Sequence, residues 1–408
     1  MDISYPTEVL AFRNEVRTVL AEELPADWRG VGAIPTSEQT REWVAEWRRT
    51  LHRRGLLGVA WPTAYGGRGL SKLHQVVLVE ELTRVGAPFG EQPLDSTTLK
   101  LMGNTLLQWG TDEQKAELLP EMLSGAIRFC QGFSEPGAGS DLASVRTRAV
   151  LEGNEWVVNG QKIWTSGGDR CNWIFVLART DPQAPKHRGI SFLLVPIDQP
   201  GVEVRPIRHM AGGSEFCEVF FTDAHTRADR LVGEVNAGWS VARTLLTFER
   251  GEEAATNPLL FRAEFDRLVA VAKARGKLSD AVLRQRIARC YARVETMRFL
   301  GYRILTDVLA EKEIGAAASV SKLYWSEYHR ELTQLALDIE GLDGLIPVGK
   351  GPSRPLRCDD PGADPMSTNS WWQVSLFART GTIYAGTSEV QRTILAEQVL
   401  GLPREPAA

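Results

Sequence analysis

Apolar residues recur with a helical period through the first third of the chain. Two stretches, 7–24 and 95–109, place them three or four residues apart, which is the spacing of an amphipathic helix. The apolar positions are Val9, Leu10, Phe12, Val16, Val19 and Leu20 in the first stretch and Leu99, Met102, Leu106 and Trp109 in the second. Thr111 followed by Gln114 has the pattern of a capping box and predicts a further helix. Segment 56–71 interrupts these helices with Pro and Gly and predicts a buried loop.

The hydrophobic pattern changes to that of short strands near residue 127. Residues 146–164 contain two β-type runs around Gly153-Asn154, which is a hairpin signal. Further strand-like runs, bounded by Pro, Gly and Asp, lie at 173–180, 189–196 and 217–223. So many short strands within about a hundred residues predict a compact antiparallel β domain.

Helical periodicity returns at Gly238. The pattern predicts helices at 238–250, 258–275, 280–312, 316–341, 371–384 and 388–401. Between them, residues 345–370 are rich in Pro, Gly, Ser and Asp and predict a long loop, of a kind that is often functional. The fold class is therefore α+β. We expect an N-terminal helical domain at 1–126, a middle antiparallel β domain at 127–236 and a C-terminal helical bundle domain at 237–408.

Composition and charge narrow the classes of partner. The 408-residue chain is 43% hydrophobic and 24% charged, usual values for a globular protein. Its net charge of −4 argues against nucleic acid as a partner. No stretch approaches the roughly 20 apolar residues of a membrane helix, and we expect no signal peptide. The five cysteines form no CxxC pair and the six histidines no HxxH or HxxxH spacing, so we expect no metal site. An odd number of cysteines in a long chain argues against a disulfide framework, so we expect a reducing, cytoplasmic setting.

Two segments of the β region combine residue types that suit an anionic or planar cofactor. The loop at 130–145 is dense in Gly, Ser and acidic residues, and backbone N–H groups in such loops can hold an anion. Segment 159–173 places Trp164 beside Thr165 and Ser166, a flat ring next to two hydroxyls. A surface turn and a core Trp with two turn residues are the alternatives, and they stay open on these residues alone.

Two segments of the C-terminal region carry further candidates. In 244–256, Glu249 directly follows apolar helix positions, and a carboxylate against an apolar wall has a raised pKa that suits a general base. The alternative is a solvated Glu–Arg helix face. In 382–403, a Gly-Thr-Ser turn opens an amphipathic helix whose N-terminus can bind a ligand. The alternative there is an ordinary Ser/Thr N-cap with Glu389 in the first turn.

Four motifs in this order give the chain its resemblance to a known family. They are Phe133-Ser134-Glu135-Pro136-Gly137-Ala138-Gly139-Ser140-Asp141, Asn159-Gly160-Gln161-Lys162-Ile163-Trp164-Thr165-Ser166, residues 220–233 with Gly238-Trp239 after them, and Tyr384-Ala385-Gly386-Thr387-Ser388-Glu389-Val390-Gln391-Arg392. Together they resemble the acyl-CoA dehydrogenase family over nearly the whole chain. The resemblance implies a C-terminal four-helix bundle, with FAD bound between the β domain and the bundles of two subunits.

The resemblance also implies roles for single residues. The expected cofactor-binding residues are Gln131, Phe133, Ser134, Ser140, Trp164, Ser166, Thr387 and Glu389, and the expected substrate-binding residues are Arg250, Ser140 and Ala385. Trp164 would cover one face of the isoalloxazine ring, and Ser166 would bond near its N5. The backbone N–H of Ala385 would bind the oxygen of the thioester.

The catalytic base differs from that of many family members. Many carry a Glu directly after the Tyr of the last motif, where this chain has Ala385. A minority, similar to isovaleryl-CoA and long-chain enzymes, place the base on an earlier helix just before an Arg, which matches Glu249-Arg250. The resemblance therefore implies that Glu249 removes the α-proton of an acyl-CoA thioester while flavin N5 accepts the β-hydride. Glu252 and Glu253 match no such position.

Two segments depart from the family pattern. Residues 272–286 lack the Arg-x-x-Phe-Gly motif that reaches the FAD diphosphate of a neighbouring subunit, and 338–342 replace a Gln-x-Phe-Gly-Gly motif. The distal half of FAD is thus left without an assigned contact, with Arg275 a weak candidate.

The resemblance implies partners as well as a cofactor. It implies a homo-oligomer, dimer or tetramer, or a heterotetramer, with an electron-transferring flavoprotein as acceptor. A flavin monooxygenase or oxidase on the same fold, and a non-catalytic subunit of a heteromeric dehydrogenase, stay open as alternatives. Glu249 argues against the monooxygenase and the non-catalytic subunit. Short branched, long linear and steroid thioesters all stay open as substrates.

Overall fold

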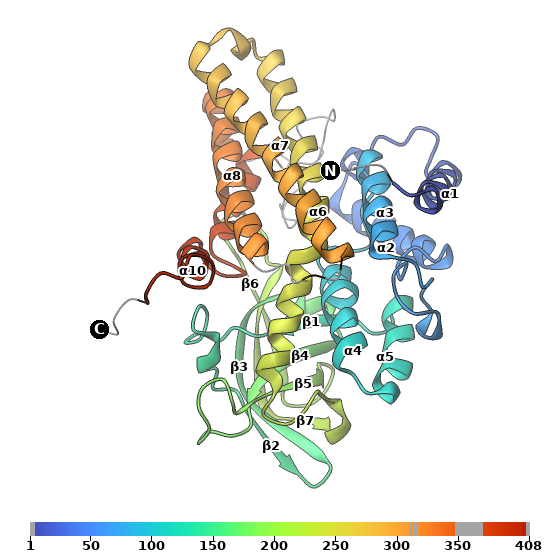
Figure 1. Ribbon diagram of the computed structural model, residues 1–408, viewed down its shortest axis with the longest axis vertical. Helices are drawn as coiled ribbons and strands as arrows, with labels where there is room; N and C mark the ends of the chain where they lie inside the picture. Colours follow the sequence, from blue (N-terminus) through green and yellow to red (C-terminus); the bar gives the residue numbers. More distant parts are fainter. Residues whose placement is uncertain (1–4, 311, 313–315, 347–369, 405–408) are drawn as a thin grey trace.

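The chain folds as helices, then strands, then helices, and this confirms the expected α+β class (Figure 1). The computed structural model describes residues 5–310, 312, 316–346 and 370–404, and within these ranges the side chains of residues 37, 247, 249–255, 308 and 316 lie outside the description. The expected 345–370 loop falls almost entirely outside the described residues. No helix in the described ranges has the length and apolar character needed to span a bilayer.

The N-terminal region is a group of helices whose apolar faces share one core. The helices are α1 (Thr7–Glu23), α2 (Ser37–Arg53), α3 (Lys72–Arg84), α4 (Asn104–Trp109) and α5 (Asp112–Ser124). The stripe predicted for α1 is buried at every position except Leu10. Helix α5 begins with the capping box predicted from Thr111 and Gln114. The helix expected at 95–109 starts as a π-helix, Ser96–Gly103, before it continues as α4.

Among the described residues, the middle region forms one eight-stranded sheet. Its strands are β1 (Phe129–Gly132), β2 (Arg148–Glu152), β3 (Glu155–Ser166), β4 (Trp173–Arg179), β5 (Ile190–Pro196), β6 (Val202–Ile207), β7 (Phe216–Arg227) and β8 (Leu231–Val232). The order is β6-β7-β3-β2-β4-β5-β8, with β1 paired to β4. The hairpin predicted at Gly153-Asn154 joins β2 to β3. Most neighbouring strands are antiparallel, but β1–β4 and β2–β4 are parallel pairs.

Both faces of the sheet are covered at β4. Every residue from Ile174 to Ala178 is buried. Phe175 and Leu177 belong to the core shared with the N-terminal helices, whereas Ile174 and Val176 belong to a second core on the other face. This alternation follows the two-residue period of a strand. The sheet is therefore a rigid support for the residues at its edges.

The C-terminal region is a bundle of long helices. It contains α6 (Gly238–Ala274), α7 (Ala281–Leu309), α8 (Ala316–Glu340), α9 (Trp371–Ala378) and α10 (Ser388–Ile394), with a π-helical turn at Leu395–Val399. The sequence predicts a break between 250 and 258, but α6 runs through it as one helix that includes Pro258. Phe261, Phe265 and Leu268 pack α6 into the bundle core with α7 and α8, which offsets the cost of an internal proline. Helix α6 thus extends from the sheet into the bundle (Figure 1).

Candidate active site

A buried lysine on β3 fixes the loop that follows β1. Lys162 is fully buried. Its Nζ donates hydrogen bonds to the carbonyl oxygens of Phe133 and Leu177 at 3.1 and 2.8 Å. It also forms a 2.8 Å ion pair with Glu135 Oε1. Three acceptors satisfy the three protons of the ammonium group, so the start of the loop is held firmly against the sheet.

Glu135 carries the other charge of this pair. Its carboxylate also accepts hydrogen bonds from the backbone N–H groups of Arg146 and Thr147, at 2.7 and 2.9 Å. Burial alone would raise the pKa of Glu135, but Lys162 and these donors bring the pKa below its usual value. Burial lowers the pKa of Lys162 to about 8, against the opposing effect of Glu135. The pair therefore joins both ends of the loop to β3.

Trp164 lies near the end of β3 in an unusual backbone conformation. Its φ is +62°, and the β3–β7 register shifts between Lys162 and Thr165. A bulge of this kind re-aims a side chain at the edge of a sheet. The indole is 57% exposed and contacts the Phe216 ring edge-on, with 6.0 Å between centroids. The strand thus presents one face of a large flat ring to solvent.

Two hydroxyl residues follow Trp164 and differ in their surroundings. Ser166 is half-buried at the last position of β3, before a turn that begins at Gly167 with φ +68°. Thr165 is fully buried, and its Oγ1 has no hydrogen-bond partner among the described residues. Ser134 lies next to this strand, because the N–H of Ile163 donates to the Ser134 carbonyl at 2.9 Å. The sheet therefore brings Ser134, Trp164 and Ser166 together.

The remaining cofactor-binding residues expected on β1 and on this loop differ in their exposure. Gln131 is half-buried on β1. Phe133 is buried, and its ring packs edge-on against Phe175 and Phe192, so its side chain faces the core. Ser140 is exposed near the middle of the loop. The loop borders a polar hollow of about 340 Å³ lined by Glu135, Pro136, Gly137, Ser144, Arg146, Thr147, Gly160 and Gln161.

A turn before α10 carries the last motif. Ala385 and Gly386 both have positive φ, +52° and +89°. Lys322 Nζ on α8 donates to the Gly386 carbonyl at 2.6 Å, and Gln391 Nε2 donates to the Ala385 carbonyl at 2.9 Å. These two bonds fix the turn against the bundle. Thr387 is the N-cap of α10, and its Oγ1 accepts from the Val390 N–H at 3.1 Å.

Glu389 is exposed in the first turn of α10. Its own backbone N–H, and then the Thr387 hydroxyl, bond to the carboxylate and lower the pKa of Glu389. Among the described residues, the hydrogen bonds of Ala385, Gly386 and Thr387 run to Gln391, Lys322 and Val390, all within the helical bundle. Aromatic rings join the end of β3 to α9, the helix that precedes this turn in the chain. Phe216, which contacts Trp164, is stacked on Phe377 of α9 at 6.0 Å and 6°.

The predicted base lies on α6. Residue 249 belongs to the helix, but the side chains of Glu249 and Arg250 lie outside the described residues. One and two turns earlier, Leu245 and Val241 are fully buried in the core shared by the sheet and the N-terminal helices. Position 249 therefore lies one helical turn after the apolar contact between α6 and the sheet. The role of Glu249 stays a prediction.

Sequence reasoning assigned no role to Lys162, Glu135 or Phe216. Lys162 and Glu135 both lie inside motifs of the family resemblance. The only sequence signal for their pairing is a lone lysine within an alternating strand pattern. That signal gives neither the direction of the side chain nor its partner. Phe216 carried no signal of its own. No cluster of metal-ligating side chains occurs in the described part of the chain.

The described residues suit a planar cofactor with polar edges. The Trp164 indole offers an exposed flat face, and Ser166 lies at its side. A Cβ built on Gly137 or Gly139 meets no atom within 4 Å, so the loop leaves open space there. Buried polar atoms without partners in the described ranges, Thr165 Oγ1 and Gln391 Oε1, occur in two of the motifs. These residues therefore suit a ligand that stacks on an aromatic ring and forms hydrogen bonds along its own polar edge.

All three regions match models of one family, in the same order. Residues 6–126 match the acyl-CoA dehydrogenase N-terminal domain, 130–224 the middle domain and 236–400 the C-terminal domain. The chain therefore belongs to the acyl-CoA dehydrogenase family and is an oxidoreductase of that class. The family resemblance inferred from the four motifs is confirmed.

Particular relatives are similar over almost the full length. The chain is 40% identical to acyl-CoA dehydrogenase IpdE1 of Mycolicibacterium smegmatis, over 98% of this chain and 99% of that protein. It shares 35% identity and a TM-score of 0.81 with the solved Tcur3481-Tcur3483 steroid ACAD, over 99% of this chain and 100% of the other. For the ChsE4-ChsE5 complex from Mycobacterium tuberculosis the values are 30% and 0.78, over 99% and 100%.

Proposed function

We propose that this acyl-CoA dehydrogenase binds FAD against Trp164 and uses Glu249 of α6 to remove the α-proton of its thioester substrate. The observation that carries the proposal is the exposed Trp164 indole beside Ser166, at the end of a strand in a chain whose three regions match the family. A bulge with a positive φ at a large aromatic residue is costly and is characteristic of functional positions. Glu249 directly precedes Arg250, as in relatives that place the base on this helix.

The expected cofactor residues form two groups by their place in the chain. Residues at the ends of β1 and β3 would hold the isoalloxazine ring, and residues before and at the start of α10 would come from a second subunit. The first group is Gln131, Phe133, Ser134, Ser140, Trp164 and Ser166, and the second is Thr387 and Glu389. Phe133 contributes through its main chain and its core contacts, since its ring faces inward. When bound, FAD supplies the acceptor for the hydride that leaves the β-carbon.

The chain's own groups handle the proton and the developing charge. A carboxylate oxygen of Glu249 takes the α-proton, and the electrons of that C–H bond form the Cα–Cβ double bond as the hydride departs. The α-proton is a weak acid, so charge on the thioester oxygen must be stabilised as it forms. The backbone N–H of Ala385 would donate to that oxygen. Gln391 supports this by holding the Ala385 carbonyl, which fixes the turn that carries the donor.

We further propose a bulky, ring-bearing acyl-CoA as the substrate class. The support is the similarity to a protein named as a steroid ACAD, at 35% identity over 99% of this chain. Arg250 and Ser140 would contact the CoA portion. The two similar solved structures are each named for two components, which supports a heteromeric assembly over a homo-oligomer. Family membership supports an electron-transferring flavoprotein as the acceptor.

The substitution Glu249→Gln tests the base. We expect the variant to keep its flavin but to be reduced by acyl-CoA at least about a hundredfold more slowly, because general-base groups contribute at least that much. Glu253→Gln, four residues along the same helix, is the matched control and should be reduced at the rate of the unmodified protein. Stopped-flow reduction without oxygen makes the comparison. Rapid reduction of Glu249→Gln would remove this residue from the mechanism.

A further inference from the structure

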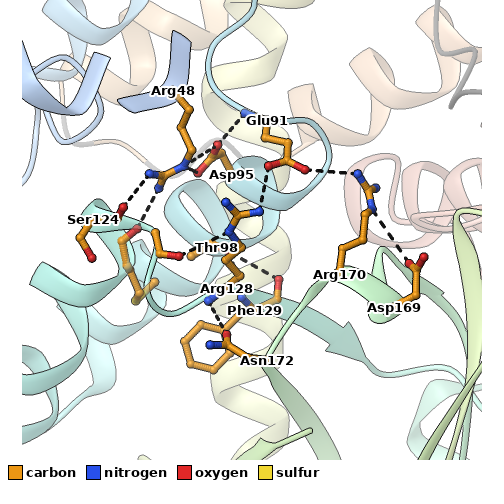
Figure 2. A network of polar contacts seen from close by, with 12 residues as sticks. Arg48, Glu91, Asp95, Thr98, Ser124, Arg128, Phe129, Asp169, Arg170 and Asn172 are labelled. Atoms are coloured by element: carbon orange, nitrogen blue, oxygen red, sulfur yellow. Dashed lines mark hydrogen bonds and ion pairs between the residues drawn. The ribbon is translucent and has the colours of Figure 1, made fainter. Parts of the chain in front are cut away.

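A single carboxylate lies between the two segments that carry the expected flavin residues. Glu91 belongs to the loop between α3 and the π-helix. Its Oε2 accepts from Arg128 Nη1 at 2.8 Å, and its Oε1 accepts from Arg170 Nη1 at 3.3 Å (Figure 2). Arg128 directly precedes β1, which leads to Gln131. Arg170 ends the short turn that follows β3.

The loop that carries Glu91 is fixed from behind by a buried ion pair. Arg48 Nε on α2 bonds Asp95 Oδ1 at 2.8 Å, and each side chain is 4% exposed. The remaining guanidinium donors bind the carbonyl oxygens of Met122, Leu123 and Ser124 at the end of α5. Figure 2 shows the bond to Ser124. Asp95 in turn accepts the backbone N–H of Glu91 at 2.6 Å. Glu91 therefore has a backbone with little freedom to move.

The same loop touches the turn after β3 a second time. A Cβ on Gly167 would come within 2.7 Å of Leu94 Cδ2, so Leu94 packs directly on the turn. The N–H of Gly167 donates to the Glu215 carbonyl at 2.7 Å, which closes the other side. The turn that follows Ser166 is thus held by a steric contact from Leu94 and a charged contact from Glu91.

The start of β1 is held in a similar way. The Arg128 N–H donates to Asn172 Oδ1 at 2.8 Å, and the Trp173 N–H donates to the Arg128 carbonyl at 3.1 Å. The guanidinium of Arg128 then reaches Glu91. Two like charges, on Arg128 and Arg170, meet at one carboxylate, and without it they would repel.

We propose that Glu91 is a positioning residue of the flavin site. By binding Arg128 and Arg170 together, it sets the position of Ser166 relative to Gln131 and Ser134. Glu91 thus acts on the flavin site from the N-terminal helical region, which contributes none of the expected flavin contacts. This role rests on the proposed function, because it assumes that FAD occupies the site formed by β1 and β3.

The test compares Glu91→Gln with Glu117→Gln. Glu117 on α5 pairs with Arg230 at 2.9 and 2.5 Å, so it also joins the helical region to the sheet, but through the residues after β7 rather than through Arg128 or Arg170. The measurements are the FAD dissociation constant, the visible flavin spectrum and the melting temperature. We expect Glu91→Gln to bind FAD roughly tenfold more weakly and to alter the spectrum, a size typical of coupled groups. Glu117→Gln should change only the melting temperature.

A second variant keeps the test decisive if Glu91→Gln folds poorly. Arg170→Gln removes the link to the turn alone, on a surface side chain that is 35% exposed. It should reproduce the spectral change, and combining it with Glu91→Gln should add little. FAD binding and a spectrum like those of the unmodified protein, in whichever variant folds, would overturn the positioning role. An unmodified protein that takes up no FAD would overturn the proposed function as well.

Discussion

Among single residues, Lys162 shows how a buried charge can shape the candidate site. Its ammonium group binds Glu135 and the carbonyl oxygens of Phe133 and Leu177, with no contact to solvent. A buried ion pair is weak evidence for net stability, but it specifies one arrangement of the groups around it. Here the arrangement specified is that of the loop after β1.

Removal of one partner leaves the other buried and unpaired. We expect Lys162→Met to lower the free energy of unfolding by about 3 kcal/mol, the cost typical of a broken buried pair. Urea unfolding measures it. The control is Lys186→Met, since Lys186 pairs with Asp141 on the surface and both side chains are more than half exposed. That change should cost less than about 1 kcal/mol. Equal costs for the two variants would contradict the structural role of Lys162.

The depressed pKa of Lys162 also predicts a pH dependence. The pKa of Lys162 is about 8 in the folded chain, whereas the pKa of an unfolded lysine is about 10.4. Between these values the unfolded state binds a proton that the folded state does not, so stability from this group rises with pH. It is fully present above the unfolded pKa and is lost as the pH falls through about 8.

The pH dependence is measured as the difference in unfolding free energy between two proteins. We expect the stability gap between the unmodified protein and Lys162→Met to widen from pH 8 to pH 10 in urea unfolding, because other groups cancel in the comparison. A gap that stays constant or narrows over this range would mean that Lys162 titrates normally.

Among secondary-structure elements, the sequence predicts what is local and misses what depends on tertiary contacts. The stripe of α1, the capping box of α5 and the β2–β3 hairpin are all confirmed, because each rests on neighbours within a few residues. The continuity of α6 through Pro258 depends on contacts with α7 and α8, and no local pattern contains them. The same holds for the parallel pairing of β1 with β4.

For the candidate site too, the sequence predicts the local segments but not the tertiary contacts between them. The motifs identify the segments that carry Ser134, Trp164, Ser166 and Thr387, but not how their side chains point. The exposed ring of Trp164 follows from a bulge in the β3–β7 pairing, and the inward ring of Phe133 follows from the aromatic core. Glu91 has no motif at all, and only the folded chain brings it between Arg128 and Arg170.

Helix α10 depends on its N-cap. The Thr387 hydroxyl accepts the Val390 N–H at 3.1 Å at the start of a seven-residue helix. We expect Thr387→Ala to cost about 1 kcal/mol of local stability, and Thr387→Ser to cost much less because the cap oxygen is kept. Hydrogen exchange of the α10 amides measures the loss. Identical protection in both variants would show that Lys322 and Gln391 hold this turn without the cap.

In the whole molecule, the parts of the candidate site come from three regions of the chain. The sheet supplies Trp164 and Ser166, α6 supplies position 249, and the N-terminal helices hold the turn after β3 through Glu91 and Leu94. In the described part of the chain, the hydrogen bonds of the turn before α10 run to Lys322, Val390 and Gln391 of the bundle. This agrees with the proposal that Thr387 and Glu389 serve the site of a neighbouring subunit.

The most direct test is an anaerobic titration of the purified protein with a panel of acyl-CoA thioesters, followed by its visible spectrum. We predict a flavin spectrum that bleaches on addition of a steroid-type thioester, and more weakly or not at all with short linear ones. Bleaching by any thioester establishes acyl-CoA dehydrogenation with a flavin, and the chain that works best defines the substrate class. A flavin spectrum that no thioester bleaches, with the assembly partner present, would contradict the account.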